Sequence, residues 1–330
     1  MNTRTLGADL TVSALGLVGM GFSHAYGAPT ERSEAVRAIR AAYDLGYTMF
    51  DTAETYGTAA DPHDNEKLVG EALKDVRDRV QLVTKFGIRF DETSPAVNKP
   101  LIPDSRPETI RSSVEGSLRR LQTDHIDLYF QHRIDPSVEP EAVAQVMDDL
   151  IREGKITHWG ISEASEDYLR RAHAVCPVTA VQNRYSMMAR WHEALFPALE
   201  RWNVGFVAFS PMANGLLTGA YRSGERFDSG LDYRSAMPQF TQEAAEENRE
   251  LLRLLQELAE QRHATPAQIS LAWMLCKKPW IVPIPGTRKE ARMAENAGAA
   301  GIALTPAEVA ALDQALDRVE MSGVFGVNKN

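Results

Sequence analysis

Cysteine is scarce in this chain, with Cys176 and Cys276 the two examples in 330 residues. Two isolated cysteines exclude a disulfide framework and a metal site built from cysteine ligands. We interpret both as reduced thiols in helical segments without a chemical role. We therefore expect no metal site in this protein.

Long apolar runs are also lacking. No segment approaches the roughly 20 consecutive apolar residues that cross a bilayer, and Met1–Thr5 shows none of the apolar character of a secretory signal. From these absences we expect a cytoplasmic protein without a membrane partner.

Positive charge is in the minority. The 36 Lys and Arg residues face 45 Asp and Glu residues, which gives a net charge of −9. A general nucleic-acid binder has the opposite balance, so we expect no nucleic-acid partner, and an anionic ligand needs a local basic patch. The composition is otherwise that of a globular protein, and the length suits one barrel or two ordinary domains.

What the chain does contain is a regular alternation of short apolar runs and amphipathic segments. Parallel strands buried on both faces have sequences of the first kind, and surface helices have the second. We predict strands at Leu15–Met20, Tyr47–Phe50, Val80–Thr84, Ile126–Gln131, Ile156–Ile161, Ala180–Gln182, Gly205–Phe209 and Ile281–Ile284. We predict interleaved helices at Ser33–Leu45, Glu66–Asp75, Pro107–Leu121, Pro140–Glu153, Ser165–Ala174, Trp191–Trp202, Thr241–Arg262 and Lys289–Ala299.

Eight strand–helix pairs predict an α/β fold, a (β/α)8 TIM barrel that spans residues 1–330 as a single domain. Arg4–Ser13 predicts an additional N-terminal β-hairpin, with Gly-Ala-Asp at its turn, that caps one end of the barrel. Pro266–Cys276 and Pro306–Val319 predict two extra helices. The long connections 86–106 and 210–240 both leave carboxyl ends of strands, and we interpret them as walls of a substrate pocket.

Four chemically active residues follow or end three of these strands. Asp51 and Tyr56 follow the second strand, Lys85 the third and His132 the fourth. Active sites of TIM barrels lie at the carboxyl ends of the strands, so we expect these side chains to meet. Alone, each has an ordinary structural explanation, as a turn cap, a core aromatic, a surface lysine or a structural histidine. Together they suit proton transfer to a carbonyl, because an ammonium stabilises a phenolate and a carboxylate holds the ammonium.

Two segments are candidates for binding phosphate. The glycines of residues 16–21 suggest a dinucleotide-binding loop, but their spacing is wrong and no helix follows directly. We interpret them as a strand end that allows close approach to a ligand. Residues 285–292 are the stronger candidate, because they follow the last strand, open a helix and carry Arg288, Lys289 and Arg292.

Taken in order, several blocks make the chain resemble the aldo-keto reductase family. They are Phe50-Asp51-Thr52-Ala53-Glu54-Thr55-Tyr56-Gly57, Val83-Thr84-Lys85, Tyr129-Phe130-Gln131-His132, Gly160-Ile161-Ser162-Glu163-Ala164-Ser165, Val181-Gln182-Asn183-Arg184-Tyr185-Ser186, Phe209-Ser210-Pro211-Met212, Pro283-Ile284-Pro285-Gly286-Thr287-Arg288 and Glu295-Asn296. The chain is most similar to the bacterial branch with the Gly-Ile-Ser-Glu and Pro-Gly-Thr-Arg blocks. The resemblance covers almost the whole length and implies a (β/α)8 fold, a nicotinamide cofactor and reversible carbonyl–alcohol chemistry.

The resemblance also implies roles for individual residues. Tyr56 is the expected general acid, Lys85 lowers its pKa, Asp51 holds Lys85, and His132 orients the carbonyl. Cofactor binding is expected, in chain order, from Gly21, Ser162, Gln182, Phe209, Ser210, Met212, Gly215, Leu217, Thr218, Gly286, Thr287, Arg288, Arg292, Glu295 and Asn296.

Within this set, Ser162 and Gln182 match the nicotinamide carboxamide site, and Phe209 matches the aromatic residue that stacks on the nicotinamide ring. Thr287, Arg288 and Arg292 match the grip on an adenosine 2′-phosphate, which favours NADPH. Many relatives have asparagine where this chain has Glu163, so the resemblance assigns Glu163 no role.

The sequence leaves several alternatives open. An NADPH-dependent reductase of aldehydes or ketones is the leading hypothesis. A nicotinamide-binding regulatory subunit related to the potassium-channel β subunits is an alternative, as is an alcohol dehydrogenase working in the oxidative direction. The substrate and the choice between monomer and homo-oligomer are undetermined. Candidate pocket residues are His24, Tyr26, Phe86, Phe90, Trp191 and Tyr221, and we interpret the tail after Met321 as a frayed end.

Overall fold

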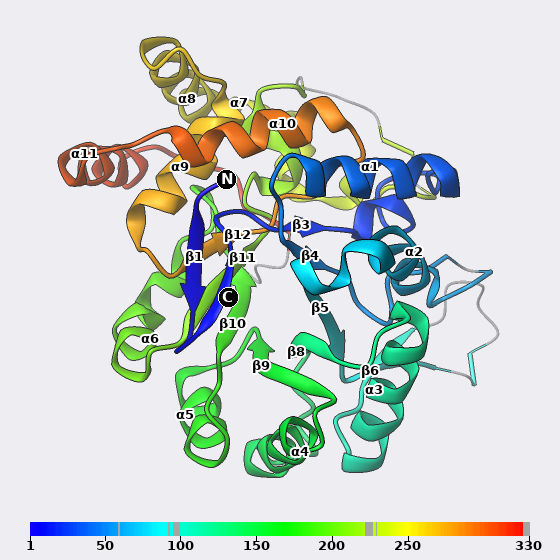
Figure 1. The fold of residues 1–330 in the computed structure, drawn as a ribbon. Helices are drawn as coiled ribbons and strands as arrows, with labels where there is room; N and C mark the ends of the chain where they lie inside the picture. The colour runs from blue at the N-terminus through cyan, green and yellow to red at the C-terminus, as the bar shows by residue number, and fades with distance from the viewer. Residues whose placement is uncertain (59, 92, 95–99, 222–226, 229, 326–330) are drawn as a thin grey trace.

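The architecture is a ring of eight parallel strands surrounded by helices (Figure 1). The computed structural model describes the chain except for residues 59, 92, 95–99, 222–226, 229 and 326–330. The strands lie in the order β12-β11-β10-β9-β8-β5-β4-β3, and the backbone N–H of Gly16 donates to Pro283 O at 3.0 Å, which joins the two ends of the sheet. The strands are β3 Leu17–Val18, β4 Met49–Asp51, β5 Gln81–Phe86, β8 Ile126–Gln131, β9 Ile156–Ser162, β10 Ala180–Arg184, β11 Gly205–Phe209 and β12 Ile281–Pro283.

Helices cover the outer face of the ring. The α-helices are α1 Arg32–Asp44, α2 Asp64–Leu73, α3 Pro107–Leu121, α4 Pro140–Arg152, α5 Glu166–Val175, α6 Phe196–Trp202, α7 Gln242–Glu247, α8 Arg249–Gln261, α9 Pro266–Lys277, α10 Glu290–Gly298 and α11 Pro306–Leu316. Short 3-10 helices are η1 Met20–Phe22, η2 Lys74–Arg79, η3 Trp191–Leu195, η4 Ala213–Thr218, η5 Tyr233–Ala236, η6 Pro238–Phe240 and η7 Ala299–Gly301. The predicted TIM barrel is confirmed, and none of the helices in the described part is long and apolar enough to cross a membrane.

Residues at the helix starts explain why these segments fold locally. Thr265 and Thr305 each cap a helix through a reciprocal capping box, and a proline occupies the first turn of both helices. Helix α1 begins at Arg32, one residue before the predicted Ser33, because Glu31 is the cap and its carboxylate accepts from the backbone N–H of Glu34 at 3.1 Å.

Some predicted boundaries were wrong. The predicted helix Thr241–Arg262 is divided at Asn248 into α7 and α8. The predicted helix Trp191–Trp202 begins with η3, and the predicted strand Leu15–Met20 is limited to the two residues of β3. The two-stranded sheet of β6, Ile88–Phe90, and β7, Leu101–Pro103, lies within the connection after β5 and was not predicted.

Three of the described α-helices lie outside the simple alternation: α7 and α8, which were predicted as one helix, and α11. Helix α9, predicted as an extra element, packs directly against β12 and is buried on most sides, including Ile269, Leu271 and Trp273. Helix α8 buries one face, through Leu251, Leu255 and Ala259, and packs on α9 from outside (Figure 1). An all-round apolar helix belongs in the interior, and this pattern distinguishes the two.

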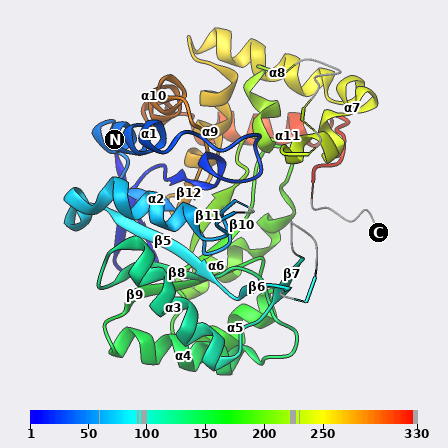
Figure 2. The same ribbon diagram turned by 90° about the vertical axis from the view of Figure 1, so that its right-hand side faces the viewer.

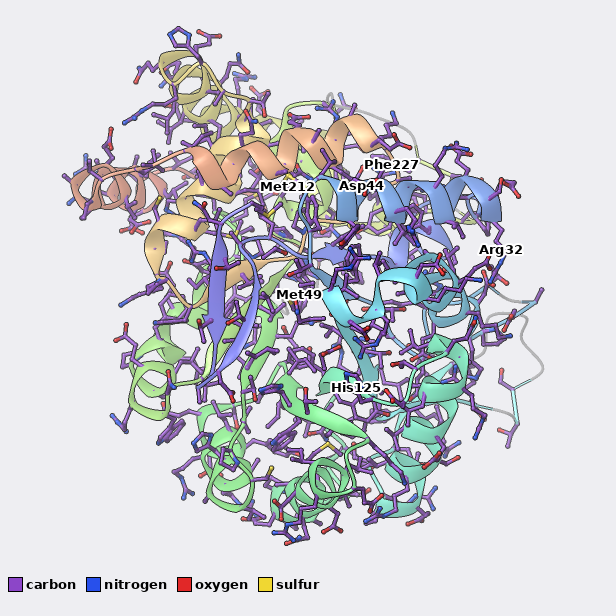
Figure 3. All side chains as sticks on the ribbon, in the orientation of Figure 1. Arg32, Asp44, Met49, His125, Met212 and Phe227 are labelled. Carbon is purple, nitrogen blue, oxygen red and sulfur yellow. The ribbon has the colours of Figure 1, made fainter. Side chains whose placement is uncertain are left out.

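The core has two layers. One apolar cluster fills the space between sheet and helices, and a smaller cluster fills the interior of the ring. The smaller cluster includes Met49, which Figure 3 labels near the middle of the ring. The N-terminal hairpin, β1 Thr3–Leu6 and β2 Leu10–Ser13, closes one end of the ring by adding Leu6 and Val12 to this inner cluster. The hairpin therefore leaves the opposite end of the ring for ligands.

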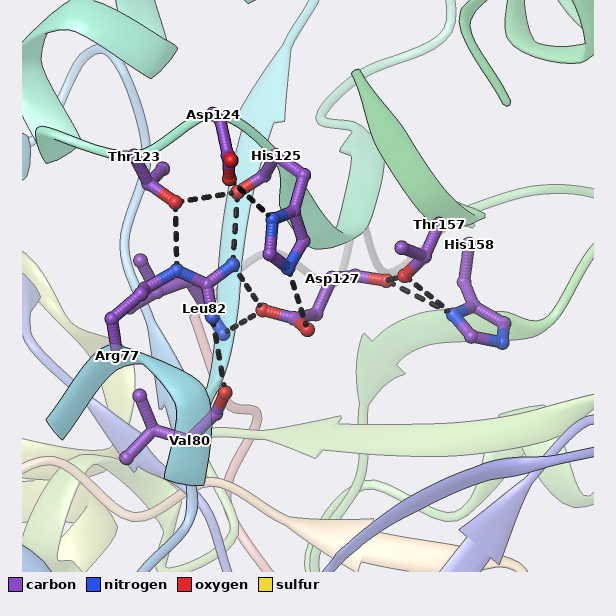
Figure 4. Close-up of polar contacts among 9 residues, drawn as sticks. All are labelled: Arg77, Val80, Leu82, Thr123, Asp124, His125, Asp127, Thr157 and His158. Atoms are coloured by element: carbon purple, nitrogen blue, oxygen red, sulfur yellow. Dashed lines mark hydrogen bonds and ion pairs between the residues drawn. The ribbon is translucent and has the colours of Figure 1, made fainter. Parts of the chain in front are cut away.

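A polar network fixes the amino-terminal ends of β5 and β8 (Figure 4). The Arg77 guanidinium donates to Thr123 Oγ1 at 2.8 Å and to His125 O at 2.9 Å, and it pairs with Asp127 at 2.8 Å. The other role of Asp127 is to accept from the backbone N–H of Leu82 at 2.8 Å. These contacts hold the two strands in register at their amino-terminal ends.

Candidate active site

A cavity of about 930 Å³ lies at the carboxyl ends of the strands. Its walls include Ile88 and Leu101 from the connection after β5, and Tyr221 and Tyr233 from the connection after β11. Figure 2 shows the β6–β7 sheet at the end of the barrel opposite to the N-terminal hairpin. The described parts of both long connections therefore form pocket walls, as predicted.

Lys85 and Asp51 form a buried ion pair beneath this cavity. Strands β4 and β5 are neighbours, and Lys85 Nζ lies 2.5 Å from Asp51 Oδ1 with both side chains fully buried. Lys85 also donates to Thr52 O at 2.7 Å. Because a buried charge is costly unless it is paired and hydrogen-bonded, these contacts hold the ammonium in one position.

Tyr56 lies directly over this ammonium. Lys85 Nζ is 4.8 Å from the centre of the Tyr56 ring, and the His132 ring meets the Tyr56 ring edge-on at a centroid distance of 5.6 Å. Tyr56 and His132 line the cavity, whereas Asp51 and Lys85 lie behind them. The structure thus brings the four predicted residues together, with two at the surface of the cavity and two as support.

Burial and charge act in opposite directions on Tyr56. Burial raises the pKa of its phenol, while the Lys85 ammonium lowers it, and the result lies above the ordinary value. The expected influence of Lys85 is present but is smaller than that of burial. The imidazole of His132 has a pKa well below its usual range because of burial and the nearby Lys85 and Arg133 cations. At neutral pH the site therefore holds a protonated phenol and a neutral imidazole.

Three residues predicted to bind nicotinamide line another wall of the cavity. Ser162 ends β9, Gln182 lies in β10 and Phe209 ends β11, and all three line the cavity. Gln182 Nε2 donates to Asp51 Oδ2 at 2.8 Å, which leaves its carbonyl oxygen as the acceptor. A hydroxyl, an amide and an aromatic face in this arrangement fit a nicotinamide carboxamide and ring.

The loop after β11, where the resemblance places the pyrophosphate, turns sharply. Ser210 has a φ of 50° and Gly215 a φ of 104°, so the backbone turns sharply twice between β11 and the end of η4. Met212 and Thr218 also line the cavity. Leu217 does not, because its side chain is fully buried in the outer core.

Cations gather where α10 begins. Gly21, Gly286, Thr287, Arg288, Arg292, Glu295 and Asn296 all line the cavity. Arg288 donates to Ala28 O at 2.7 Å and to Tyr26 O, and Arg292 pairs with Glu295. Free N–H groups of a helix start next to arginines make this end of the cavity suited to a phosphate.

Several lining residues escaped the sequence analysis, namely Arg133, Arg184, Asn214, Tyr233 and Arg234. Position could have revealed two of them. Arg133 directly follows His132 in the sequence. Arg184 lies two residues beyond Gln182, so the side chains of Gln182 and Arg184 lie on the same face of β10. Arg234 lies in an irregular connection, and no sequence pattern indicated its direction.

The predicted substrate-pocket residues divide into two groups. His24, Tyr26 and Tyr221 line the cavity, whereas Phe86, Phe90 and Trp191 are not among its lining residues. Phe325 also lines the cavity, so the prediction of a frayed tail after Met321 was wrong for the residues up to Phe325. The tail residues 326–330 lie outside the described part of the chain.

Comparison with known proteins agrees with this geometry. The chain matches the Aldo/keto reductase family over residues 14–317 and belongs to it. It is 38% identical over 319 residues to "Probable aldo-keto reductase 1" of Glycine max, covering 94% of this chain and 88% of the relative. It is 36% identical over 326 residues to "Aldo-keto reductase str7" of Strobilurus tenacellus, with 97% and 92% covered.

A solved structure extends the comparison. The glycerol dehydrogenase AKR11B4 from Gluconobacter oxydans superposes with a TM-score of 0.86 at 28% identity, covering 99% of both chains. The chain is accordingly an NAD(P)H-dependent oxidoreductase that acts on carbonyl or CH–OH groups.

Proposed function

We propose that this protein is an NADPH-dependent reductase of small aldehydes or ketones and that Tyr56 is its general acid. The observation that carries the proposal is the buried Lys85–Asp51 pair under the Tyr56 ring, with His132 beside it at the cavity surface. We further propose that residues 1–330 act as one domain.

In this proposal the carbonyl oxygen lies between Tyr56 and His132. Tyr56 is protonated at neutral pH and gives its proton to that oxygen, while neutral His132 donates a hydrogen bond that fixes the carbonyl direction. The Lys85 ammonium stabilises the phenolate that remains, and Asp51 keeps Lys85 in place. Solvent then returns a proton to Tyr56.

The residues around the cavity fit a dinucleotide along its length. When bound, reduced nicotinamide supplies the hydride that reaches the carbonyl carbon. Ser162 and Gln182 would hold the carboxamide, Phe209 would stack on the ring, and the loop after β11 would hold the pyrophosphate. Arg288 and Arg292 would grip a 2′-phosphate, which supports NADPH over NADH.

The oxidative direction is the second candidate. A solved relative with the same fold is a glycerol dehydrogenase, and the groups that donate a proton to a carbonyl can remove one from an alcohol. Cellular cofactor ratios rather than the site would then set the direction.

The test measures absorbance at 340 nm with the purified protein. Reduction is assayed with aldehydes and ketones and either NADPH or NADH. Oxidation is assayed with small alcohols, including glycerol, and either NADP⁺ or NAD⁺. Faster NADPH consumption with carbonyls supports the proposal. Turnover confined to alcohols favours the dehydrogenase. Tight NADPH binding without any turnover supports a regulatory nicotinamide-binding subunit and contradicts the proposal.

A further inference from the structure

The cavity is strongly positive although the protein is acidic. Among the residues that the structure describes, its lining includes five arginines and one lysine but a single carboxylate, Glu295, while the chain has a net charge of −9. Arg234 pairs with Asp232 at 2.6 Å, and Arg292 pairs with Glu295. Arg288 lies at the proposed 2′-phosphate end, next to Lys289. Arg234 and Arg292 are therefore neutralised by carboxylates, and Arg288 is proposed to bind the 2′-phosphate of the cofactor.

Arg133 and Arg184 have neither. Arg133 donates to His132 O at 2.6 Å and reaches Ser162 Oγ at 3.4 Å. Arg184 reaches Asn214 Oδ1 at 3.4 Å, and its guanidinium lies 5.0 Å from the Phe209 ring centre. Within the part of the chain that the structure describes, neither guanidinium forms an ion pair. The Glu163 carboxylate accepts from the Arg184 backbone N–H, and its negative charge acts on the Arg184 guanidinium without forming an ion pair with it.

Both cations lie at the catalytic end of the cavity. Arg133 directly follows His132, and its charge lowers the pKa of both Tyr56 and His132. Arg184 is half-buried between Phe209 and Phe325, and burial lowers the pKa of its guanidinium. The Glu163 carboxylate opposes this effect, and the positive charge of Arg133 adds to it. Two guanidinium groups that face one cavity without an ion-pair partner repel each other, and an anion between them relieves this repulsion.

We propose that the substrate carries a carboxylate in addition to its carbonyl, and that Arg133, with Arg184, binds that carboxylate. The planar fork of arginine matches the two oxygens of a carboxylate. The inference rests on the proposed reductase function and names its substrate class as oxo acids. Arg133 and Arg184 would be specificity-determining residues, since neither takes part in proton or hydride transfer.

The test compares each oxo acid with its own methyl ester. 4-Oxobutanoate and 4-formylbenzoate are assayed against methyl 4-oxobutanoate and methyl 4-formylbenzoate, which keep the carbonyl and remove the charge. In the wild type we expect kcat/KM for an acid to exceed that for its ester by about 10- to 100-fold, the range of a charge-assisted hydrogen bond. The preference should fall as NaCl rises, because salt screens exposed charges.

Variants assign the preference to residues. Arg133→Met should reduce the acid-to-ester ratio about 10-fold or more, whatever its effect on the ester itself, and Arg133→Lys should retain part of the preference. Arg184→Met should reduce the ratio in the same direction. Arg152→Met removes the same charge from the carboxyl end of α4, away from the cavity, and should leave the ratio unchanged. Thermal unfolding checks that each variant is folded.

Three outcomes would overturn the inference. Equal rates for acids and esters in the wild type would show that the cations do not select a carboxylate. Equal losses for acid and ester in Arg133→Met would assign Arg133 to the fold. A raised dissociation constant for NADPH with an unchanged ratio would assign the arginines to the cofactor. If the protein reduces the esters and not the acids, the inference about the carboxylate fails and the proposed reductase function stands. If it reduces neither, the proposed function itself is contradicted.

Discussion

Gln182 Nε2 donates to Asp51 Oδ2 at 2.8 Å, while Lys85 donates to the other carboxylate oxygen of Asp51 at 2.5 Å. A single buried carboxylate therefore connects the proposed proton-transfer residues to a proposed nicotinamide residue. Burial raises the pKa of Asp51, and both donors act against this effect. The two halves of the site are coupled through hydrogen bonds to one side chain.

Replacement of Gln182 by Leu should destabilise the fold. It leaves one oxygen of a buried carboxylate without its donor, which costs about 1–3 kcal/mol, and it should also weaken NADPH binding. Urea unfolding followed by fluorescence measures the first effect and a NADPH titration the second. An unfolding free energy within 0.5 kcal/mol of wild type would contradict the coupling through Asp51.

The pH dependence of reduction should be broad. Tyr56 has a pKa above its ordinary value near 10, and His132 has one well below 6.5. A general acid works below its pKa, so Tyr56 stays protonated and His132 stays neutral between roughly pH 6.5 and 9.5. We expect kcat/KM to vary less than about threefold over this interval. A fall in kcat/KM centred near pH 8 would show that Tyr56 ionises at lower pH than the structure indicates. The fall must persist in Glu54→Gln, because the pKa of Glu54 is about 8.

Glu54 should make the protein less stable in alkali. Burial and the neighbouring Glu66 carboxylate raise the pKa of Glu54 from 4.5 to about 8, against weaker opposing effects of Ser113, Arg120 and the Gly87 N–H. The folded state therefore holds a proton that the unfolded state has lost, so stability falls as pH rises from about 4.5 to about 8 and the loss is complete above that.

Glu54→Gln should remove this loss. Its melting temperature should exceed that of wild type at pH 9 by about 5 °C, with a smaller difference at pH 5. Glu243→Gln, the same change at an exposed position of α7, serves as the control. Parallel pH dependences of stability in wild type and Glu54→Gln would mean that Glu54 is ionised in the folded protein.

Arg288→Leu should reduce discrimination between the two nicotinamide cofactors. Loss of a guanidinium that grips a 2′-phosphate should raise KM for NADPH by about 10- to 100-fold and leave KM for NADH nearly unchanged. Arg288 also donates to Tyr26 O and Ala28 O. Equal increases for both cofactors would therefore show that it holds the loop after β3 and not a phosphate.

The sequence predicted the barrel and the meeting of the four proposed catalytic residues, because both depend on strand order. Asp51, Lys85 and His132 lie at or just after the ends of adjacent strands, and parallel strands bring such positions together whatever the loops do. The helix starts at Pro266 and Pro306 were predicted for a similar local reason, because proline favours the first turn of a helix.

Other features could not be predicted, because they depend on contacts between distant segments. The direction of the Arg234 side chain, for example, follows from its pairing with Asp232. The net shift of the Tyr56 pKa also required the structure, since the sequence indicates the Lys85 charge but not the extent of burial. Leu217 matched a family position, yet its side chain faces the core.

The most direct test of the central claim is NADPH-dependent aldehyde reduction by Tyr56→Phe, measured beside a fluorescence titration of NADPH. The substitution removes the phenolic proton while keeping the ring over Lys85 and beside His132. We expect kcat to fall about 10²- to 10⁴-fold, the usual contribution of a general acid, with the dissociation constant of NADPH changed less than about threefold. A variant that binds NADPH normally and retains more than a tenth of the wild-type kcat would contradict the assignment of Tyr56 as the proton donor.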